Sequence, residues 1–193
     1  MLKRFWLFAA VFFALFAAGC APPWTVIKQA EPNPFAGKKE FVVLPIDYEG
    51  LMVGNKTEAE YLGEKKDKTV DRFEQDKVDM NDLFTTNLQA VAKDEGIDVD
   101  VAAGEVKTFV IKPHIGFMEP GFYAVVASAP SEVVLRLKIE DKDGKVLDEI
   151  EIKHQTPPSN WGNVAAGSRY RQDAEWIGRV AGRYLTTRVY PDD

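Results

Sequence analysis

The sequence predicts an α+β fold: a two-layer α/β sandwich in which helices pack on one face of a mixed or antiparallel sheet. Apolar residues recur at helical spacing in two segments, about 79–94 and 170–188. Between these segments apolar and polar residues alternate, as they do in half-buried strands. An apolar, β-branched run at 40–48 adds a strand before the first helix. Helices and strands in this order favour one layer of each around a single core.

The first 19 residues have the layout of a signal peptide. Lys3 and Arg4 precede 14 residues, 5–18, that carry no polar side chain. This run is shorter than the roughly 20 residues that span a bilayer, and prolines follow it at once. The small residues at its end predict cleavage between Gly19 and Cys20.

Cys20 is the only cysteine of the chain, so an internal disulfide is excluded. The motif Ala-Ala-Gly-Cys resembles the lipobox of bacterial lipoproteins, with Ala17 where leucine is usual. The resemblance implies a diacylglyceryl thioether on Cys20 and an acylated (palmitate) amino terminus, and two or three acyl chains anchor a protein almost permanently. Ala21, in place of aspartate, matches the outer-membrane pattern of enterobacterial lipoproteins. We therefore expect the periplasmic face of the outer membrane rather than the inner membrane.

The mature chain is acidic. Without residues 1–19 it keeps 22 basic and 30 acidic side chains, a net charge of −8. Nucleic-acid binding requires clustered lysine and arginine, so this class of partner is excluded. Broad adhesion to anionic headgroups is also disfavoured, which leaves the membrane anchor and an envelope protein as the expected partners.

Residues 20–38 are predicted to form the lipidated cysteine and a proline-rich tether. Its four prolines favour extended backbone, so the domain is expected to stand off the bilayer. Three apolar side chains in the tether are predicted to dock either on the domain or on lipid: Trp24, Val26 and Ile27. A single α/β domain is expected from 39 to 193.

The domain is expected to open with a buried strand at 40–48, interrupted by Pro45. A charged insertion follows at about 55–78, expected to be solvated and partly helical around 57–65. The alternative interpretation of the insertion is a docking surface that carries Tyr61, Leu62 and Phe73.

A helix from about 79 to 94 is predicted by four residues on one face: Phe84, Leu88, Val91 and Ala92. Asp79, Asn81 and Asp82 favour its start. Strands are expected at 97–101 and 105–121, the second with a break at Pro113.

The clearest pattern is a hairpin formed by residues 131–141 and 145–154. With Asp143 and Gly144 as a two-residue turn, Leu137 lies opposite Ile150, and Lys138 lies opposite Glu149. One face of the hairpin is then apolar and the other charged.

The last helix, from Tyr170 to about Arg188, is predicted to bury one side: Ala174, Ile177, Ala181, Tyr184 and Leu185. Gly178 and Gly182 lower helix propensity by about 1 kcal/mol each, which predicts close packing of this helix.

Four stretches of the chain resemble short proteobacterial envelope lipoproteins of a domain-of-unknown-function family: the lipobox, VVLPIDYEG, DKDGKVL and GRVAGRYL. The order of elements is similar to the N-terminal α/β domain of the Tol-system propeller protein. These resemblances imply an envelope accessory protein without assigned catalysis.

Catalytic and metal-binding motifs are weak in this sequence. A calcium loop at DKDG would put Ile139 and Ile150 where carboxylates are required. His114 and His154 have no cysteine partners, which makes a zinc site a weak hypothesis. We expect no metal, no cofactor and no enzymatic activity.

The segment at 160–171 has the composition of a recognition surface. Five residues there and on the following helix are candidate partner-binding residues: Trp161, Arg169, Tyr170, Arg171 and Arg179. The function predicted from the sequence is a lipid-anchored accessory protein that docks on an envelope transport or assembly complex. The alternative is a small periplasmic binder of an anionic or glycan ligand through the loop around Trp161. A structural interpretation of this loop, in which Trp161 caps the core, is also open.

Overall fold

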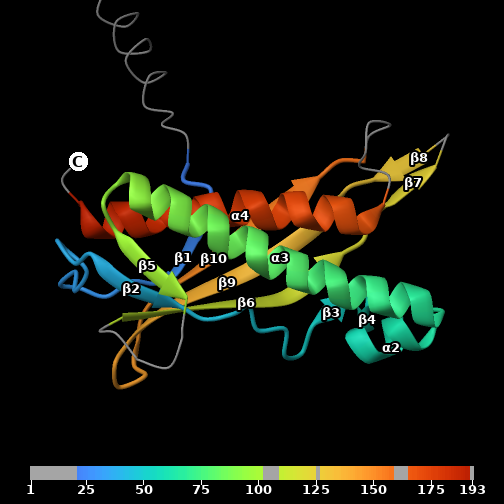
Figure 1. Cartoon of the computed structure of the whole chain (residues 1–193), viewed down its shortest axis with the longest axis horizontal. Helices are drawn as coiled ribbons and strands as arrows, with labels where there is room; N and C mark the ends of the chain where they lie inside the picture. The colour runs from blue at the N-terminus through green and yellow to red at the C-terminus, as the bar shows by residue number, and fades with distance from the viewer. Residues whose placement is uncertain (1–20, 102–108, 125–126, 159–164, 192–193) are drawn as a thin grey trace, which may run out of the picture.

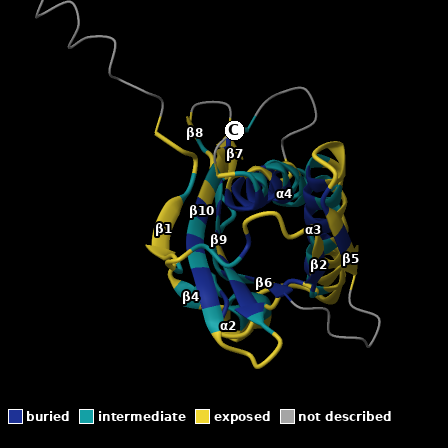
Figure 2. Ribbon diagram, turned by 90° about the vertical axis from the view of Figure 1, so that its left-hand side faces the viewer, coloured by how far each residue is buried: buried dark blue, intermediate teal, exposed yellow. Residues whose placement is uncertain are grey.

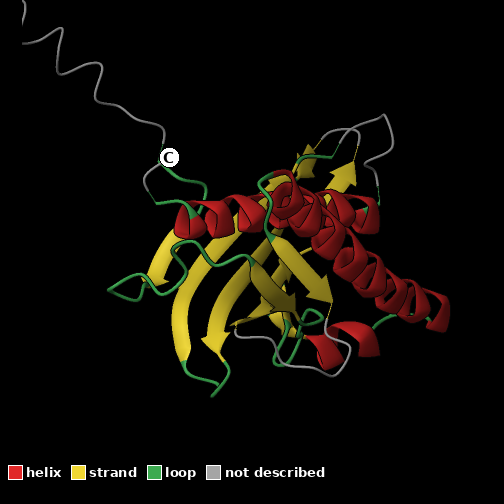
Figure 3. Cartoon of the chain, turned by 60° about the vertical axis from the view of Figure 1, so that its left-hand side comes forward, coloured by secondary structure: helices red, strands yellow, loops and turns green. Residues whose placement is uncertain are grey.

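The computed structural model describes residues 21–101, 109–124, 127–158 and 165–191. One mixed sheet runs in the order β1-β10-β9-β6-β2-β5, with the short strands β3 and β4 beside β6. Two long helices cover one face of this sheet (Figures 1 and 3), so the predicted fold class is confirmed.

The strands are β1 Thr25–Lys28, β2 Glu40–Val43, β3 Met52–Val53, β4 Lys56–Thr57, β5 Asp98–Val101, β6 Phe109–Glu119, β7 Phe122–Ala124, β8 Ala127–Ala129, β9 Ser131–Asp141 and β10 Val146–Thr156. The helices are α2 Glu58–Gly63, α3 Asp67–Asp94 and α4 Ala166–Val189. Strands β7 and β8 form a separate two-stranded sheet.

The core lies between the helices and the sheet, where Figure 2 shows the buried segments in dark blue. The five residues predicted to be buried on α4 are buried. So are the alternate side chains of β9 from Val133 to Ile139, because one face of a strand takes every second residue.

The β9–β10 register is the predicted one, with Leu137 opposite Ile150 and Lys138 opposite Glu149. The predicted two-residue turn is wrong. Asp141 N donates to Lys145 O, which closes a three-residue turn in which Gly144 has a φ of 79°. The register then shifts between Val146 and Asp148, and this irregularity restores the predicted pairing.

Strand β6 passes through Pro113 without the predicted break. On the β2 side of β6, Leu44 N donates to Ile111 O, and Asp47 N donates to Pro113 O. The ring nitrogen of Pro113 therefore falls where no neighbour needs a donor. The register shift of β6 against β9 lies between Ile115 and Phe117 instead.

The charged insertion at 55–78 is more ordered than predicted. It contains β4, α2 and the first turns of α3, which begins at Asp67 rather than near residue 79. Phe73 is buried, and its ring lies 5.6 Å from the ring of Tyr61. These two aromatic side chains are used to pack α2 on α3.

From Trp24 onward, the segment predicted to be a proline-rich tether is part of the fold, which agrees with docking on the domain, one of the two predicted outcomes. Strand β1 pairs antiparallel with β10 at the edge of the sheet. Phe35 is fully buried against Phe41 and Phe109. The domain therefore begins at Trp24, about 15 residues before the predicted boundary.

Gly178 and Gly182 pack closely on α3, as predicted. A Cβ atom on Gly178 would lie 2.4 Å from the backbone oxygen of Phe84, and one on Gly182 would lie 2.7 Å from Cβ of Val91. The long contact between α3 and α4 depends on these two positions having no side chain.

We expect Gly178→Ala to lower the free energy of unfolding by about 1–3 kcal/mol, because a methyl group cannot displace backbone atoms of α3. Urea unfolding followed by circular dichroism measures the change. The control is Gly63→Ala, since a Cβ at Gly63 meets nothing within 4 Å. Equal midpoints for the two variants would contradict the close approach of the helices.

Candidate functional site

The structure changes the role predicted for the five candidate partner-binding residues. Trp161, Gly19 and Cys20 lie outside the described residues. Arg169 and Tyr170 are each 1% exposed, so the prediction that they face a partner is wrong. The helix turns both side chains toward the sheet, because they share the face of Ile177.

Arg171 and Arg179 are partly exposed, but neither is free as predicted. Arg171 Nη1 donates to Asp76 Oδ1 at 2.6 Å and lies 3.4 Å from Asp79 Oδ2. Arg179 pairs with Glu175 and donates to Asn87 Oδ1 at 3.3 Å. Both guanidinium groups therefore hold α4 in place rather than being available to a partner.

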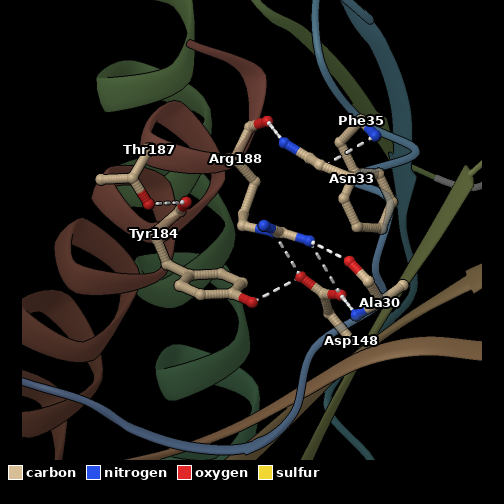
Figure 4. A network of polar contacts seen from close by, with 7 residues as sticks. All are labelled: Ala30, Asn33, Phe35, Asp148, Tyr184, Thr187 and Arg188. Carbon is tan, nitrogen blue, oxygen red and sulfur yellow. Dashed lines mark hydrogen bonds and ion pairs between the residues drawn. The ribbon is translucent and has the colours of Figure 1, made fainter. Parts of the chain in front are cut away.

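The first buried polar cluster centres on Asp148 of β10 (Figure 4). Its carboxylate has no exposed surface and accepts from Arg188 Nε at 2.8 Å and from the Tyr184 hydroxyl at 2.5 Å. The backbone N–H of Ala30 donates to its second oxygen at 2.8 Å. Burial and the bond to Asp148 raise the pKa of Tyr184, so this phenol remains a donor.

The same cluster fastens the N-terminal segment to the end of α4. Arg188 Nη2 donates to Ala30 O at 3.0 Å, and Asn33 Nδ2 donates to Arg188 O at 2.7 Å. Gly37 N donates to Val189 O at 2.9 Å. We call residues 24–37 the N-terminal strap.

The strap leaves little free chain before the domain. The Trp24 ring packs edge-on against Tyr184, with 5.5 Å between the centroids. Only residues 21–23 separate Trp24 from Cys20. Four Cα steps reach about 14 Å when fully extended.

The second buried polar cluster centres on Asp173 of α4. Its carboxylate has no exposed surface and accepts from Ser131 Oγ at 2.7 Å, Thr156 Oγ1 at 2.6 Å and His154 Nδ1 at 2.7 Å. The His154 ring stacks on Trp176, with 4.3 Å between the centroids.

This second cluster contains serine, histidine and aspartate, but not in the order of a nucleophilic triad. In a triad the histidine lies between the serine and the aspartate and accepts the serine proton. Here Ser131 and His154 both bind Asp173 directly. The arrangement joins β9, β10 and α4.

Arg169 holds the base of the β7–β8 hairpin. Its Nη2 donates to Pro120 O at 2.6 Å. At Gly121, whose φ is 58°, a Cβ would lie 2.3 Å from Pro130 O. The two ends of the hairpin therefore lie close together, beside the Ser131–Asp173 contact. This hairpin was not predicted from the sequence, although the absence of charged residues from 120 to 131 marks it.

The sheet face opposite the helices has two shallow hollows of about 480 and 360 Å³ that share His114 and Lys138. Lys112 Nζ pairs with Glu140 at 2.6 Å, and Arg136 lies 3.7 Å from Glu151. His114 Nε2 is 2.9 Å from Glu49 O. Two cations of this face, Lys112 and Arg136, are thus paired with acids. Among the described residues, no three histidine, cysteine or carboxylate side chains are grouped as metal ligands.

None of the helices in the described ranges has the length and apolarity that a bilayer crossing requires.

No protein-family model matches the chain, and no curated protein sequence matches it significantly. Solved structures similar to it include a PelC dodecamer from Paraburkholderia phytofirmans, 13% identical, covering 81% of this chain and 97% of that chain with a TM-score of 0.44. Protein XCC0632 from Xanthomonas campestris, of the DUF330 family model, is 14% identical, with 84% and 93% covered and a TM-score of 0.48.

A candidate lipoprotein from Caulobacter crescentus CB15 is 12% identical, with 56% and 81% covered and a TM-score of 0.33. Similarity at this level carries no functional conclusion, so function is inferred from this chain itself. None of these three is the Tol-system protein, and that part of the resemblance stays a prediction.

We expect Asp148→Ala to lower the free energy of unfolding by about 3–5 kcal/mol, because it leaves the buried Arg188 and Tyr184 without their acceptor. Limited proteolysis should then cleave the N-terminal strap first. Asp143→Asn, at an exposed turn, is the control and should stay within about 0.5 kcal/mol of the parent. A strap that resists protease in the Asp148 variant would contradict its attachment through this carboxylate.

Asp76 gives a pH-dependent prediction. Burial raises the pKa of Asp76 in the folded protein, although Arg171 opposes this shift. The folded state therefore binds the proton more tightly than the unfolded state. Ionisation of Asp76 then lowers the free energy of unfolding as pH rises from about 4 upward. Asn at this position does not titrate. Urea unfolding between pH 3.5 and 7 should show the parent losing stability relative to Asp76→Asn as pH rises; a constant difference would rule the shift out.

Proposed function

We propose that this chain is a lipid-anchored accessory protein at the periplasmic face of the outer membrane, which docks on an envelope transport or assembly complex and catalyses no reaction. The observation that carries the proposal is the short connection between Cys20 and the folded domain. A lipid on Cys20 would hold the domain within about 14 Å of the headgroups.

The N-terminal strap supports this function because it fixes how the domain is held. A flexible tether lets a domain sample many orientations. Here the chain is bound to β10 and to the end of α4 up to Trp24, so one side of the domain faces the bilayer. A fixed orientation presents the same surface to a neighbouring envelope protein at every encounter.

The ligand-binding alternative has weaker support. Arg169, Arg171 and Arg179 all make contacts within the fold. An anionic ligand would have to compete with carboxylates or a buried carbonyl for these donors. The proposed accessory function does not depend on them.

We expect Cys20→Ser to abolish lipid attachment. Metabolic labelling with an alkyne fatty acid should mark the parent and not the variant, and the variant should remain unprocessed or leave the membrane fraction after a carbonate wash. Ser128→Cys is the control, because it adds an exposed thiol without changing the lipobox. A Cys20→Ser protein that is cleaved and still resists the wash would overturn the anchor.

The accessory role is tested by capture from membranes. Protein anchored in its native membrane is crosslinked and its partners are identified, while the purified protein is screened by thermal shift against anionic glycans and nucleotides. A reproducible envelope partner without a ligand shift supports the proposal. A ligand shift of several degrees without a partner would favour the alternative.

A further inference from the structure

The β7–β8 hairpin carries a concentrated exposed apolar surface. Phe122 is 54% exposed and Tyr123 is 37% exposed. The sequence from Pro120 to Ser131 contains no charged residue, although the mature chain has a net charge of −8. Large exposed aromatic side chains in a charge-free segment are typical of an interaction site.

The exposed surface does not arise from a loosely held loop. Arg169 binds the chain before β7, and the Ser131 hydroxyl binds Asp173 just after β8. Both contacts are made by buried side chains of α4. The fold therefore holds Phe122 and Tyr123 away from its own core.

The hairpin lies on the same side of the molecule as the start of the N-terminal strap. In Figure 1, the blue start of the described chain and strands β7 and β8 all lie toward the top of the view. Helix α4 runs between them, and its 24 residues measure about 36 Å. A bilayer that holds Cys20 close to the domain is therefore close to the hairpin as well.

The charge of the connecting helix fits this placement. Arg183 is exposed on α4, and Arg179 is partly exposed one turn before it. Glu175 is the only acidic residue of α4 that is not buried. In Figure 1, helix α2 and the start of α3, which carry many of the acidic residues, lie toward the lower right and away from this side.

We propose that the β7–β8 hairpin is a second membrane contact, in which Phe122 and Tyr123 enter the headgroup region of the leaflet that holds the Cys20 lipid. Aromatic side chains favour this interfacial layer. The outer edges of a two-stranded sheet keep unpaired N–H and C=O groups, so the hairpin stays at the interface and does not enter the hydrocarbon. This inference rests on the proposed function, which includes the lipid on Cys20.

The test uses the acylated full-length mature protein, with a single new thiol labelled by an environment-sensitive nitrobenzoxadiazole dye. Because acylation blocks Cys20, Phe122→Cys places the dye on the hairpin. Asp143→Cys is the matched control, since the β9–β10 turn is exposed and lies at the lower side of Figure 1. Tyr123→Cys provides a second position on the hairpin.

Each protein is reconstituted in vesicles of phosphatidylethanolamine and phosphatidylglycerol that contain a phospholipid spin-labelled near the top of its acyl chain. We expect quenching at 122 and 123 at least threefold stronger than at 143. Equal quenching at the three positions would overturn the proposal. So would a blue-shifted, unquenched dye at 122, because it would mean that protein covers the hairpin.

Dye labelling of Cys20 tests the lipid anchor separately from the hairpin contact. If Cys20 of the parent reacts with the dye, it carries no lipid and the proposed function fails. The hairpin is then measured in Cys20→Ser proteins at high vesicle concentration. There the dye at 122 must again be quenched more strongly than the dye at 143, or the second contact fails as well.

Discussion

A buried carboxylate must be matched by donors, and Asp148 obtains its three donors from two distant parts of the chain, the end of α4 and the N-terminal strap. The Arg188 guanidinium, the Tyr184 hydroxyl and the Ala30 N–H converge on its two oxygens. Removing Asp148 takes away the acceptor that the buried Arg188 and Tyr184 share, and removing Arg188 takes away the only cation that pairs with Asp148 among the described residues. The position of the N-terminal strap therefore follows from this single charge, and with it the distance between the fold and its anchor.

Helix α4 connects this cluster to the rest of the molecule. Its last turn holds the strap, and its glycines allow α3 to approach in the middle. Its first turns fasten the hairpin through Arg169, and they fasten strands β9 and β10 through Asp173. A single helix thus sets the relative positions of the lipid attachment point and of the apolar hairpin. If a membrane holds the domain as proposed, its orientation there follows from the packing of α4.

Sequence patterns predicted the parts of the fold that depend on periodicity. The alternation of β9 and β10 fixed their pairing, and a glycine at each of two helical positions indicated the close contact with α3. The first turns of α3 were missed because residues 67–78 contain few apolar residues at helical spacing. The strap was missed because its prolines are typical of linkers, although Phe35 was a signal of burial.

The candidate site was harder to predict for a related reason. Arg169 and Arg188 occupy positions on the buried face of α4, but an arginine in a sequence normally indicates a surface. Their partners lie 49 and 40 residues away, and no local pattern connects them. Whether a charged side chain faces solvent or a buried acceptor is decided by the tertiary fold.

The contact between Ala30 and Arg188 also sets an order of events for a chain that crosses a membrane from its N-terminus. These residues are 158 positions apart, so the bond between them cannot form before the last helix has been delivered. Until then, the N-terminal strap has no end of α4 to bind, and a lipid on Cys20, as proposed, would be joined to a segment not yet fastened to the fold. Once the last turn of α4 forms, the N-terminal strap can bind to it, and the free linker is reduced to the few residues before Trp24. If Cys20 carries the proposed lipid, a chain that stops before Arg188 would keep its anchor but lack the contact that holds the N-terminal strap against the end of α4.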